Sequence, residues 1–187
     1  MKRANSYEKH IYCLEGNWNK NPRSNQSLKP ILELLHTTSK TKYIHRKCNT
    51  KKEFIQGLLK FTQKRYANYT ILYIAFHGRT NRICCGNEYI TLNEIATVLE
   101  GKLEGKIIHF GSCSTLRTSQ INIKDFIDRT NCTLISGYKR NVDYISSAAF
   151  ELLYFDSLQK YCSYSKLKDS LTNHYSILVD KLQFHIE

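Results

Sequence analysis

The chain carries the stretch Ile71-Leu72-Tyr73-Ile74-Ala75-Phe76-His77-Gly78, an almost uninterrupted apolar run that stops at an imidazole. Continuous apolar runs of this length are typical of strands that are covered on both faces, as in parallel sheets. A second stretch, Lys106-Ile107-Ile108-His109-Phe110-Gly111-Ser112-Cys113, follows the same pattern and stops at a thiol. We therefore expect two buried, neighbouring strands with a reactive side chain at the end of each.

Strand-like and helix-like patterns alternate outward from these two stretches. Apolar or alternating patterns predict further strands at 10–14, 43–48, 82–85, 88–90 and 132–138. Helical spacing of apolar residues predicts helices that begin near Ser27, Phe54, Thr91, Thr118, Tyr144 and Ser165. We expect the weakly alternating strand at 43–48 near an edge, and a hairpin that turns at Gly86-Asn87. This alternation predicts one α/β domain over residues 1–187 with a mostly parallel central sheet.

Polar residues mark three of the expected helix starts. Ser27 can cap the first helix through its hydroxyl. Thr91 and Glu94 have the spacing of a capping box, in which a hydroxyl and a carboxylate accept backbone N–H groups reciprocally. Asp143 precedes the helix expected from Tyr144, so its carboxylate could cap that helix or bind a basic side chain of a substrate.

The two reactive side chains fall where open parallel sheets place their sites, beyond the carboxyl ends of the strands. The imidazole of His77 can take the proton of the Cys113 thiol and later protonate a leaving group, so the pair predicts a general acid/base and its nucleophile. The backbone amides of Gly78 and Cys113 are candidate donors to an oxyanion. The alternative interpretation is a buried structural thiol and a hydrogen-bonded loop histidine.

An apolar strand ending in His-Gly, followed by one ending in a small residue and Cys, resembles the arrangement in caspase-like (clan CD) cysteine peptidases. This group includes caspases, metacaspases, legumain, separase, gingipains and bacterial CHAT-domain proteases. The resemblance covers residues 71–138 strongly and the flanking strand–helix order loosely. The caspase signature Q-A-C-x-G is absent, since the chain has Gly111-Ser112-Cys113-Ser114-Thr115, so the chain looks like a small bacterial-type member.

The resemblance implies a caspase-like three-layer α/β/α sandwich and hydrolysis of a protein or peptide substrate through an acyl-enzyme on Cys113. His77 would protonate the leaving amine, and no metal, cofactor or third side chain is needed. The acidic preference of caspases does not carry over, because their signature is missing. Family analogy also suggests control by a partner chain or a small signalling molecule, and a role in bacterial stress or antiphage defence.

The resemblance also places the specificity pocket, in the loop after the first strand and in the segment after the strand that follows Cys113. The expected substrate-binding residues there are Trp18, Tyr138 and Asp143, although Trp18 could equally be a packed loop aromatic. Asp143 would suit a basic substrate, whereas Lys139-Arg140 would suit an acidic one. The charge preference therefore stays open.

Two hypotheses compete with a cysteine peptidase, and one of them comes from the net charge. The 187 residues carry a formal net charge of +12, which fits a solvated basic surface or a contact for nucleic acid or an acidic partner. The second hypothesis is therefore a non-catalytic α/β module that binds nucleic acid or a nucleotide. A third keeps Cys113 and His77 but assigns them to another thiol hydrolase or transferase.

Several classes of protein have no support in the sequence. No P-loop, dinucleotide fingerprint or G-x-S-x-G elbow occurs. Cys84-Cys85 with His77 and His109 lacks the ligand spacing of a zinc site, so we expect no metal. The N-terminus lacks the apolar run of a signal peptide, and no stretch approaches the ~20 apolar residues of a membrane span. We expect no membrane partner and a reducing cytoplasm that keeps the thiols free.

Overall fold

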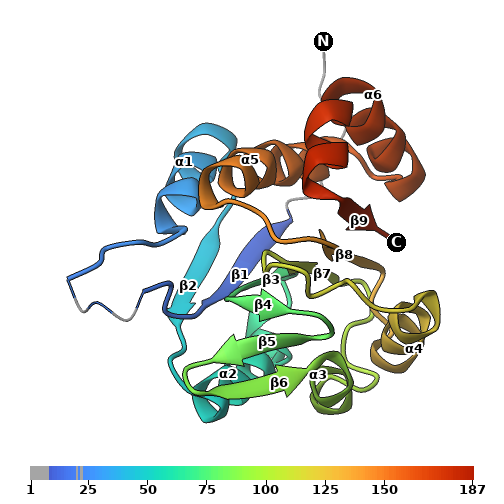
Figure 1. Ribbon diagram of the computed structural model, residues 1–187. Helices are drawn as coiled ribbons and strands as arrows, with labels where there is room; N and C mark the ends of the chain where they lie inside the picture. Colours follow the sequence, from blue (N-terminus) through green and yellow to red (C-terminus); the bar gives the residue numbers. More distant parts are fainter. Residues whose placement is uncertain (1–8, 20, 22) are drawn as a thin grey trace.

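A mostly parallel sheet organises the protein, whose computed structural model describes residues 9–19, 21 and 23–187. In this part of the chain the sheet has six strands in the order β2-β1-β3-β7-β8-β9 (Figure 1). The strands are β1 (His10–Glu15), β2 (Tyr43–Lys47), β3 (Tyr69–Ala75), β7 (Ile107–Phe110), β8 (Leu134–Tyr138) and β9 (Phe184–Ile186). Only β9 runs antiparallel to its neighbour, which confirms an α/β fold with a mostly parallel sheet.

Helices lie on both faces of this sheet. Figure 1 shows α1, α5 and α6 on one side and α2, α3 and α4 on the other. The helices are α1 (Lys29–Ser39), α2 (Lys51–Phe61), α3 (Leu92–Val98), α4 (Gln120–Thr130), α5 (Tyr144–Lys160) and α6 (Tyr164–Leu182), with a short 3₁₀ turn at Lys64–Tyr66. The arrangement is compatible with a three-layer sandwich. None of the described helices combines the length and apolarity needed to cross a membrane.

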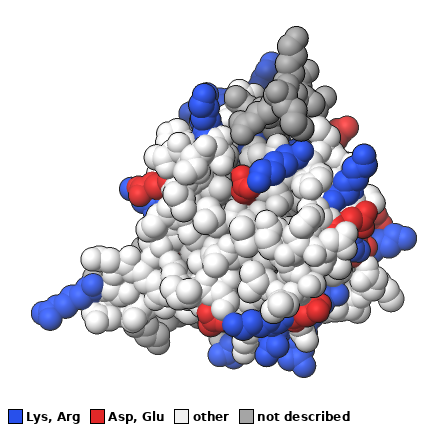
Figure 2. Space-filling model, turned by 90° about the horizontal axis from the view of Figure 1, so that it is seen from above, with Lys and Arg blue, Asp and Glu red and all other residues white. Residues whose placement is uncertain are grey.

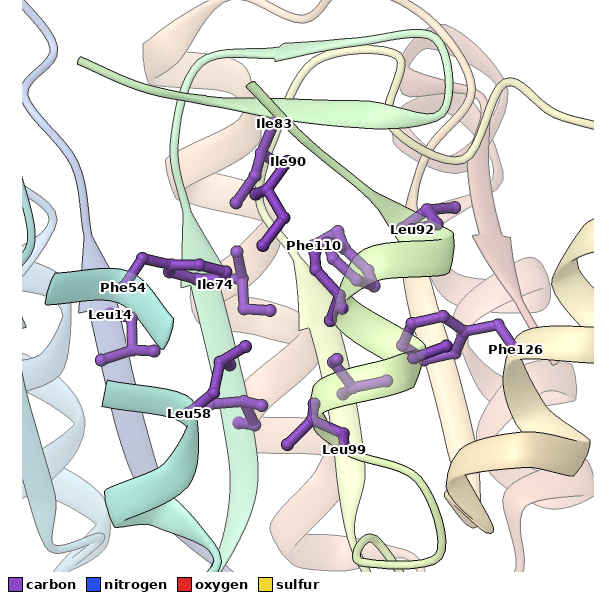
Figure 3. Close-up of a cluster of buried hydrophobic side chains, with 14 of the residues drawn as sticks. Leu14, Phe54, Leu58, Ile74, Ile83, Ile90, Leu92, Leu99, Phe110 and Phe126 are labelled. Carbon is purple, nitrogen blue, oxygen red and sulfur yellow. The ribbon is translucent and has the colours of Figure 1, made fainter. Parts of the chain in front are cut away.

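Both faces of the sheet are buried because side chains alternate along each strand. In β3, Leu72 and Ile74 belong to the core on the side of α2 and α3, whereas Ile71 and Tyr73 belong to the core on the side of α5. Figure 3 shows Ile74 and Phe110 from adjacent strands within the first of these cores. This double burial is the physical reason for the continuous apolar runs in the sequence.

The described residues also form a small antiparallel sheet that follows β3. Its strands are β4 (Gly78–Arg79), β5 (Arg82–Cys85) and β6 (Glu88–Thr91). The predicted hairpin is confirmed, and Gly86 makes its turn with a φ of +65°. Ile83 and Ile90 point from this sheet into the core of the main sheet (Figure 3). The sequence did not predict β4, because two residues carry no alternating pattern.

Other local predictions are confirmed. Thr91 and Glu94 form the capping box of α3, and the strand after Lys42 lies at an edge of the main sheet as β2. Asp143 caps α5 by accepting a hydrogen bond from the amide of Ser146 at 2.8 Å. These features are local, so short sequence patterns were enough to predict them.

The expectation that Ser27 caps the first helix is wrong. Leu28 is the N-cap of α1, and no side chain caps that helix. The Ser27 hydroxyl instead donates to Oε2 of Glu15 at 2.7 Å. Glu15 is fully buried, and a buried carboxylate has to be hydrogen-bonded, so the Ser27 hydroxyl donates to it. The same hydroxyl oxygen accepts a hydrogen bond from the amide of Lys29 at 3.2 Å, although Ser27 lies one position before the N-cap.

Candidate functional site

The two reactive side chains lie at the same edge of the main sheet. β3 and β7 pair in parallel with Ile74 opposite Phe110, and His77 and Cys113 each follow that pair by the same number of residues. The two segments stay side by side beyond the strands, since the amide of Phe76 donates to Oγ of Ser112 at 3.3 Å. The structure therefore brings the backbones of the predicted nucleophile and general acid/base together.

Gly78 allows this close approach. A Cβ atom built on Gly78 would lie 2.3 Å from the carbonyl oxygen of Cys113 and 2.4 Å from Oγ1 of Thr115. Such distances are shorter than any ordinary contact, so a side chain would push the segment after β3 away from Cys113. The space beside Gly78 is thus filled by the turn that carries the thiol.

Cys113 lies in the turn that follows β7 and is partly exposed. Its Sγ accepts a hydrogen bond from the amide of Val142 at 3.4 Å and lies 3.5 Å from the carbonyl oxygen of the same residue. Ser114 has a φ of +54°, so the chain turns sharply directly after the thiol. The N–H of Val142 can stabilise negative charge on the sulfur.

His77 is exposed and is anchored through one ring nitrogen. Its Nε2 lies 2.7 Å from the carbonyl oxygen of Trp18, and a carbonyl oxygen can only accept, so Nε2 carries the proton. The neutral ring then keeps a lone pair on Nδ1. The hydrogen bonds of the described residues include none between this imidazole and the Cys113 thiol. Catalytic hydrogen bonds are often loose before substrate binds.

Trp18 contacts the site as expected. Its ring packs edge-on against His77 with centroids 5.4 Å apart, and against Tyr144 with centroids 5.9 Å apart. Its indole Nε1 donates to Oε1 of Glu15 at 2.5 Å. Trp18 is therefore both a packed loop aromatic and a neighbour of His77.

Glu15 anchors this loop from inside the protein. The fully buried carboxylate at the end of β1 also accepts hydrogen bonds from Ser27 Oγ, Leu28 N and His45 Nε2, and pairs with Lys47 Nζ at 3.2 Å. Burial acts to raise the pKa of Glu15, but the hydrogen bonds from His45, Ser27, Trp18 and Leu28 outweigh it and lower the pKa to about 2. Glu15 is therefore ionised at neutral pH.

Sequence reasoning named the loop after the first strand but not Glu15 as its anchor. The available signal was a single acidic residue at the end of an otherwise apolar strand, directly before Gly16 and near Trp18. Such a residue needs several donors if it is buried. The donors come from the loop after β1, from the residues just before α1 and from β2, and the sequence does not show that these segments surround Glu15.

The expectation that Tyr138 binds substrate conflicts with its position. Its side chain is fully buried, and its hydroxyl donates to Oε1 of Glu151 at 3.2 Å inside the core. The ring of Tyr138 therefore has no face open to a ligand, because it points toward α5 rather than out of the sheet edge. Asp143 is exposed, but its carboxylate caps α5, and the hydrogen bonds from Ser146 hold its pKa below the ordinary range.

A buried polar network supports the site from the α5 side of the sheet. Glu151 accepts hydrogen bonds from the hydroxyls of Tyr73 and Tyr138 and from Nε2 of His109. Each of these donors comes from a different strand, β3, β8 or β7. A satisfied network of this kind holds the strands that precede His77 and Cys113 in fixed register with α5.

No metal centre is formed by the described residues, since they contain no group of three or more His, Cys, Asp or Glu side chains placed around one ion. A recess of about 130 Å³ lies elsewhere, between α3 and α4, and is lined in part by Asn93, Asn122 and Asp125. It is lined by neither Cys113 nor His77.

The fold and site thus define an α/β protein that presents a thiol and an anchored imidazole at the carboxyl edge of a parallel sheet. The chain belongs to DUF6642, a family of unknown function whose model matches residues 8–187. A comparison with curated proteins found no match. The case for a function therefore depends on the chemistry of the site.

Proposed function

We propose that the protein is a caspase-like cysteine endopeptidase with Cys113 as nucleophile and His77 as general acid/base. One observation carries this proposal: the two residues follow paired parallel strands at the same level, and the Nε2 anchor of His77 leaves Nδ1 as the basic nitrogen. The caspase-like assignment within the three-layer α/β class is part of the proposal and rests on the His-Gly and Gly-Ser-Cys motifs.

The proposed reaction has two stages. The Cys113 thiolate attacks the carbonyl carbon of the scissile peptide bond, and the C–N bond breaks as His77 transfers a proton to the leaving amine. Water then attacks the resulting thioester and gives one proton to His77, and the thioester bond breaks to release the acid product and the Cys113 thiolate. Backbone N–H groups of Gly78 and Cys113 are the proposed donors to the oxyanion in both stages.

Most of the other cysteines differ from Cys113 in accessibility, although Cys84 is also partly exposed. Burial raises the pKa of Cys85 to about 12 and that of Cys48 to about 11, so these thiols stay protonated. Cys162 is exposed and lies outside the site, between α5 and α6. Cys162 is therefore a matched control for thiol chemistry that needs only solvent access.

Labelling and cleavage test the proposal together. We expect peptidyl acyloxymethyl ketones to modify Cys113 faster than Cys162, and a peptide library made from digested cellular protein to be cleaved. Cys113→Ala should abolish both reactions, and His77→Ala should reduce cleavage by about 10²–10⁴-fold. Cys162→Ala should change neither. Undiminished cleavage by Cys113→Ala would overturn the proposal, and cleavage of esters or thioesters alone would favour another thiol hydrolase.

The nucleic-acid-binding alternative has less support. Figure 2 shows Lys and Arg side chains scattered over the face seen from above, with acidic side chains among them and large uncharged areas between. A backbone-binding surface normally gathers its positive charge along a stripe or patch. This face fits a solvated basic surface better.

A further inference from the structure

The small sheet has an outward face that carries two arginines and no carboxylate. Ile83 and Ile90 point into the core (Figure 3), so the residues that alternate with them point outward. The strand pairing then gives this face the following members: Arg79, Arg82, Cys84, Tyr89 and Thr91. We refer to these five residues as the arginine face.

The two arginines are placed against each other. Arg79 and Arg82 are direct partners in the β4–β5 ladder, where like charges repel and weaken the pairing. Neither forms an ion pair with a carboxylate among the described residues, whereas Arg129 lies within reach of both Glu100 and Asp125. The carboxylate at the border of this face belongs to Glu94, which accepts a hydrogen bond from Oγ1 of Thr91 at 3.0 Å and is paired with Lys51. An external anion bound by both arginines would offset their repulsion.

The ring of Tyr89 lies beneath both guanidinium groups. The Cζ of Arg82 lies 4.3 Å from the centroid of the Tyr89 ring, and the Cζ of Arg79 lies 5.8 Å from it. Stacking occupies the flat face of a guanidinium and leaves the N–H groups at its edge free to bind a carboxylate in bidentate geometry. Arg79 and Tyr89 are exposed, and Arg82 is partly exposed, so this face is open to solvent.

The arginine face adjoins the candidate active site. Arg79 lies two positions after His77, and the amide of Cys84 donates to the carbonyl oxygen of His77 at 2.8 Å. In the proposed reaction His77 protonates the leaving amine, so the substrate residues after the scissile bond lie on the His77 side. Those residues are the ones that continue toward the arginine face.

We propose that the arginine face binds acidic side chains of a peptide substrate, in the part that leaves as the amine. The position along the substrate rests on the proposed function, whereas the binding of carboxylates does not. A peptide fits better than a nucleic acid, because two arginines fixed beside a peptidase site match one or two carboxylates rather than a long phosphate backbone.

Binding to a variant that cannot turn over tests the carboxylate site by itself. The probe is a fluorescein-labelled oligoglutamate peptide, measured by fluorescence anisotropy on Cys113→Ala protein, with a Ser-Gly peptide as the neutral control. Arg79→Gln with Arg82→Gln should weaken binding about tenfold or more. Arg79→Lys with Arg82→Lys should lose part of the affinity, because an ammonium cannot bind a carboxylate through two parallel N–H groups.

The matched control removes the same charge elsewhere. Arg65 also stacks on a tyrosine, with its Cζ 4.9 Å from the Tyr66 ring, so Lys64→Gln with Arg65→Gln is the comparison. This control should change binding less than about twofold, since distant exposed charges are screened at physiological salt. Equal losses in the two Gln double variants would overturn the proposal, as would tighter, Arg79- and Arg82-dependent binding of an oligothymidylate.

Cleavage then tests the position along the substrate. The otherwise native enzyme should favour library peptides with Asp or Glu after the scissile bond, and Arg79→Gln with Arg82→Gln should remove this preference. Cleavage without such a preference would overturn the inference and leave the proposed function intact. Carboxylate binding without any cleavage would retain the arginine face as an anion site and overturn the proposed function.

Discussion

The carboxylate of Glu15 connects three parts of the chain: the end of β1, the loop that carries Trp18, and β2 through His45 and Lys47. The carbonyl oxygen of Trp18 in turn accepts a hydrogen bond from Nε2 of His77. A residue that touches neither the thiol nor the imidazole thereby fixes which nitrogen of the imidazole is basic. We regard Glu15 as a positioning residue for His77.

Glu15→Gln should make the protein less stable and less sensitive to acid. The pKa of Glu15 is about 2 in the folded protein against an ordinary value of 4.5, so its ionised form stabilises the fold above pH 4.5 and this stabilisation is lost as the pH falls toward 2. The difference corresponds to about 3 kcal/mol. Urea unfolding at pH 3 and pH 6 should show a smaller loss of stability on acidification for Glu15→Gln. Equal losses in the two proteins would contradict the prediction.

The same variant should alter His77 without removing it. In ¹⁵N-histidine-labelled protein we expect NMR to show His77 as the tautomer with its proton on Nε2, because Trp18 offers only a carbonyl acceptor. Glu15→Gln should loosen Trp18 and mix the two tautomers of His77. His174, which is exposed and lies in α6, provides the control signal. A proton found on Nδ1 of His77 in the native protein would contradict this assignment.

At the scale of elements, β4 and the turn after β7 form one packed unit. Gly78 in β4 faces the carbonyl oxygen of Cys113, and Val142 contacts the sulfur of the same residue. The turn that carries the thiol is therefore held by an earlier and by a later segment of the chain. The turn meets the 141–142 segment through Sγ of Cys113 and Oγ of Ser114, and it fills the space beside Gly78 with the carbonyl oxygen of Cys113 and Oγ1 of Thr115. This explains why the site tolerates no side chain at Gly78.

Gly78→Ala should therefore change both stability and the reactivity of Cys113. The added methyl would meet backbone at 2.3 Å, and relieving such overpacking costs about 1–3 kcal/mol. Gly101→Ala is the control, because its site has open space but a φ of +64°, so it also destabilises the fold. The midpoint temperature of thermal unfolding should fall in both variants. Only Gly78→Ala should slow modification of Cys113 by iodoacetamide, and equal rates would contradict the prediction.

Elements with strong local patterns could be predicted from the sequence, and weaker ones could not. β1, β3, β7 and β8 are buried on both faces, so their apolar runs reveal them. β4 and β9 are too short to show a pattern and form only because β5 and β8 offer them partners. The prediction that Tyr138 binds substrate failed because an apolar run buried on both faces does not show toward which layer of helices each side chain points.

For the whole molecule, Glu151 joins the sheet to the helices that cover it. Its carboxylate on α5 receives donors from β3, β7 and β8, and it is almost fully buried. The positions of His77 and Cys113 could be predicted from their own strands. The network behind them could not, because its members are spread over distant parts of the sequence, from Tyr73 to Glu151.

Glu151→Ala should destabilise the protein strongly, by about 3–5 kcal/mol, since it leaves three buried donors without their acceptor. Glu151→Gln, which keeps one acceptor oxygen, should cost less. Urea unfolding followed by circular dichroism measures both. Asp156→Ala, on the same helix but paired with Lys160 at the surface, should change stability by less than about 1 kcal/mol. A similar effect of the Glu151 and Asp156 variants would contradict the role of the network.

The hydrogen bond between His77 and Trp18 spans 59 positions, and the contact of Cys113 with Val142 spans a further 29. During synthesis, the thiol emerges from the ribosome well before the segment that completes its surroundings. A chain that ends before Val142 therefore lacks one of the contacts that surround Cys113. Chemistry that needs both Cys113 and His77 in their native positions starts only after this segment has been made and folded. Under the proposed function, the order of synthesis therefore keeps an unfinished chain from cleaving cellular proteins.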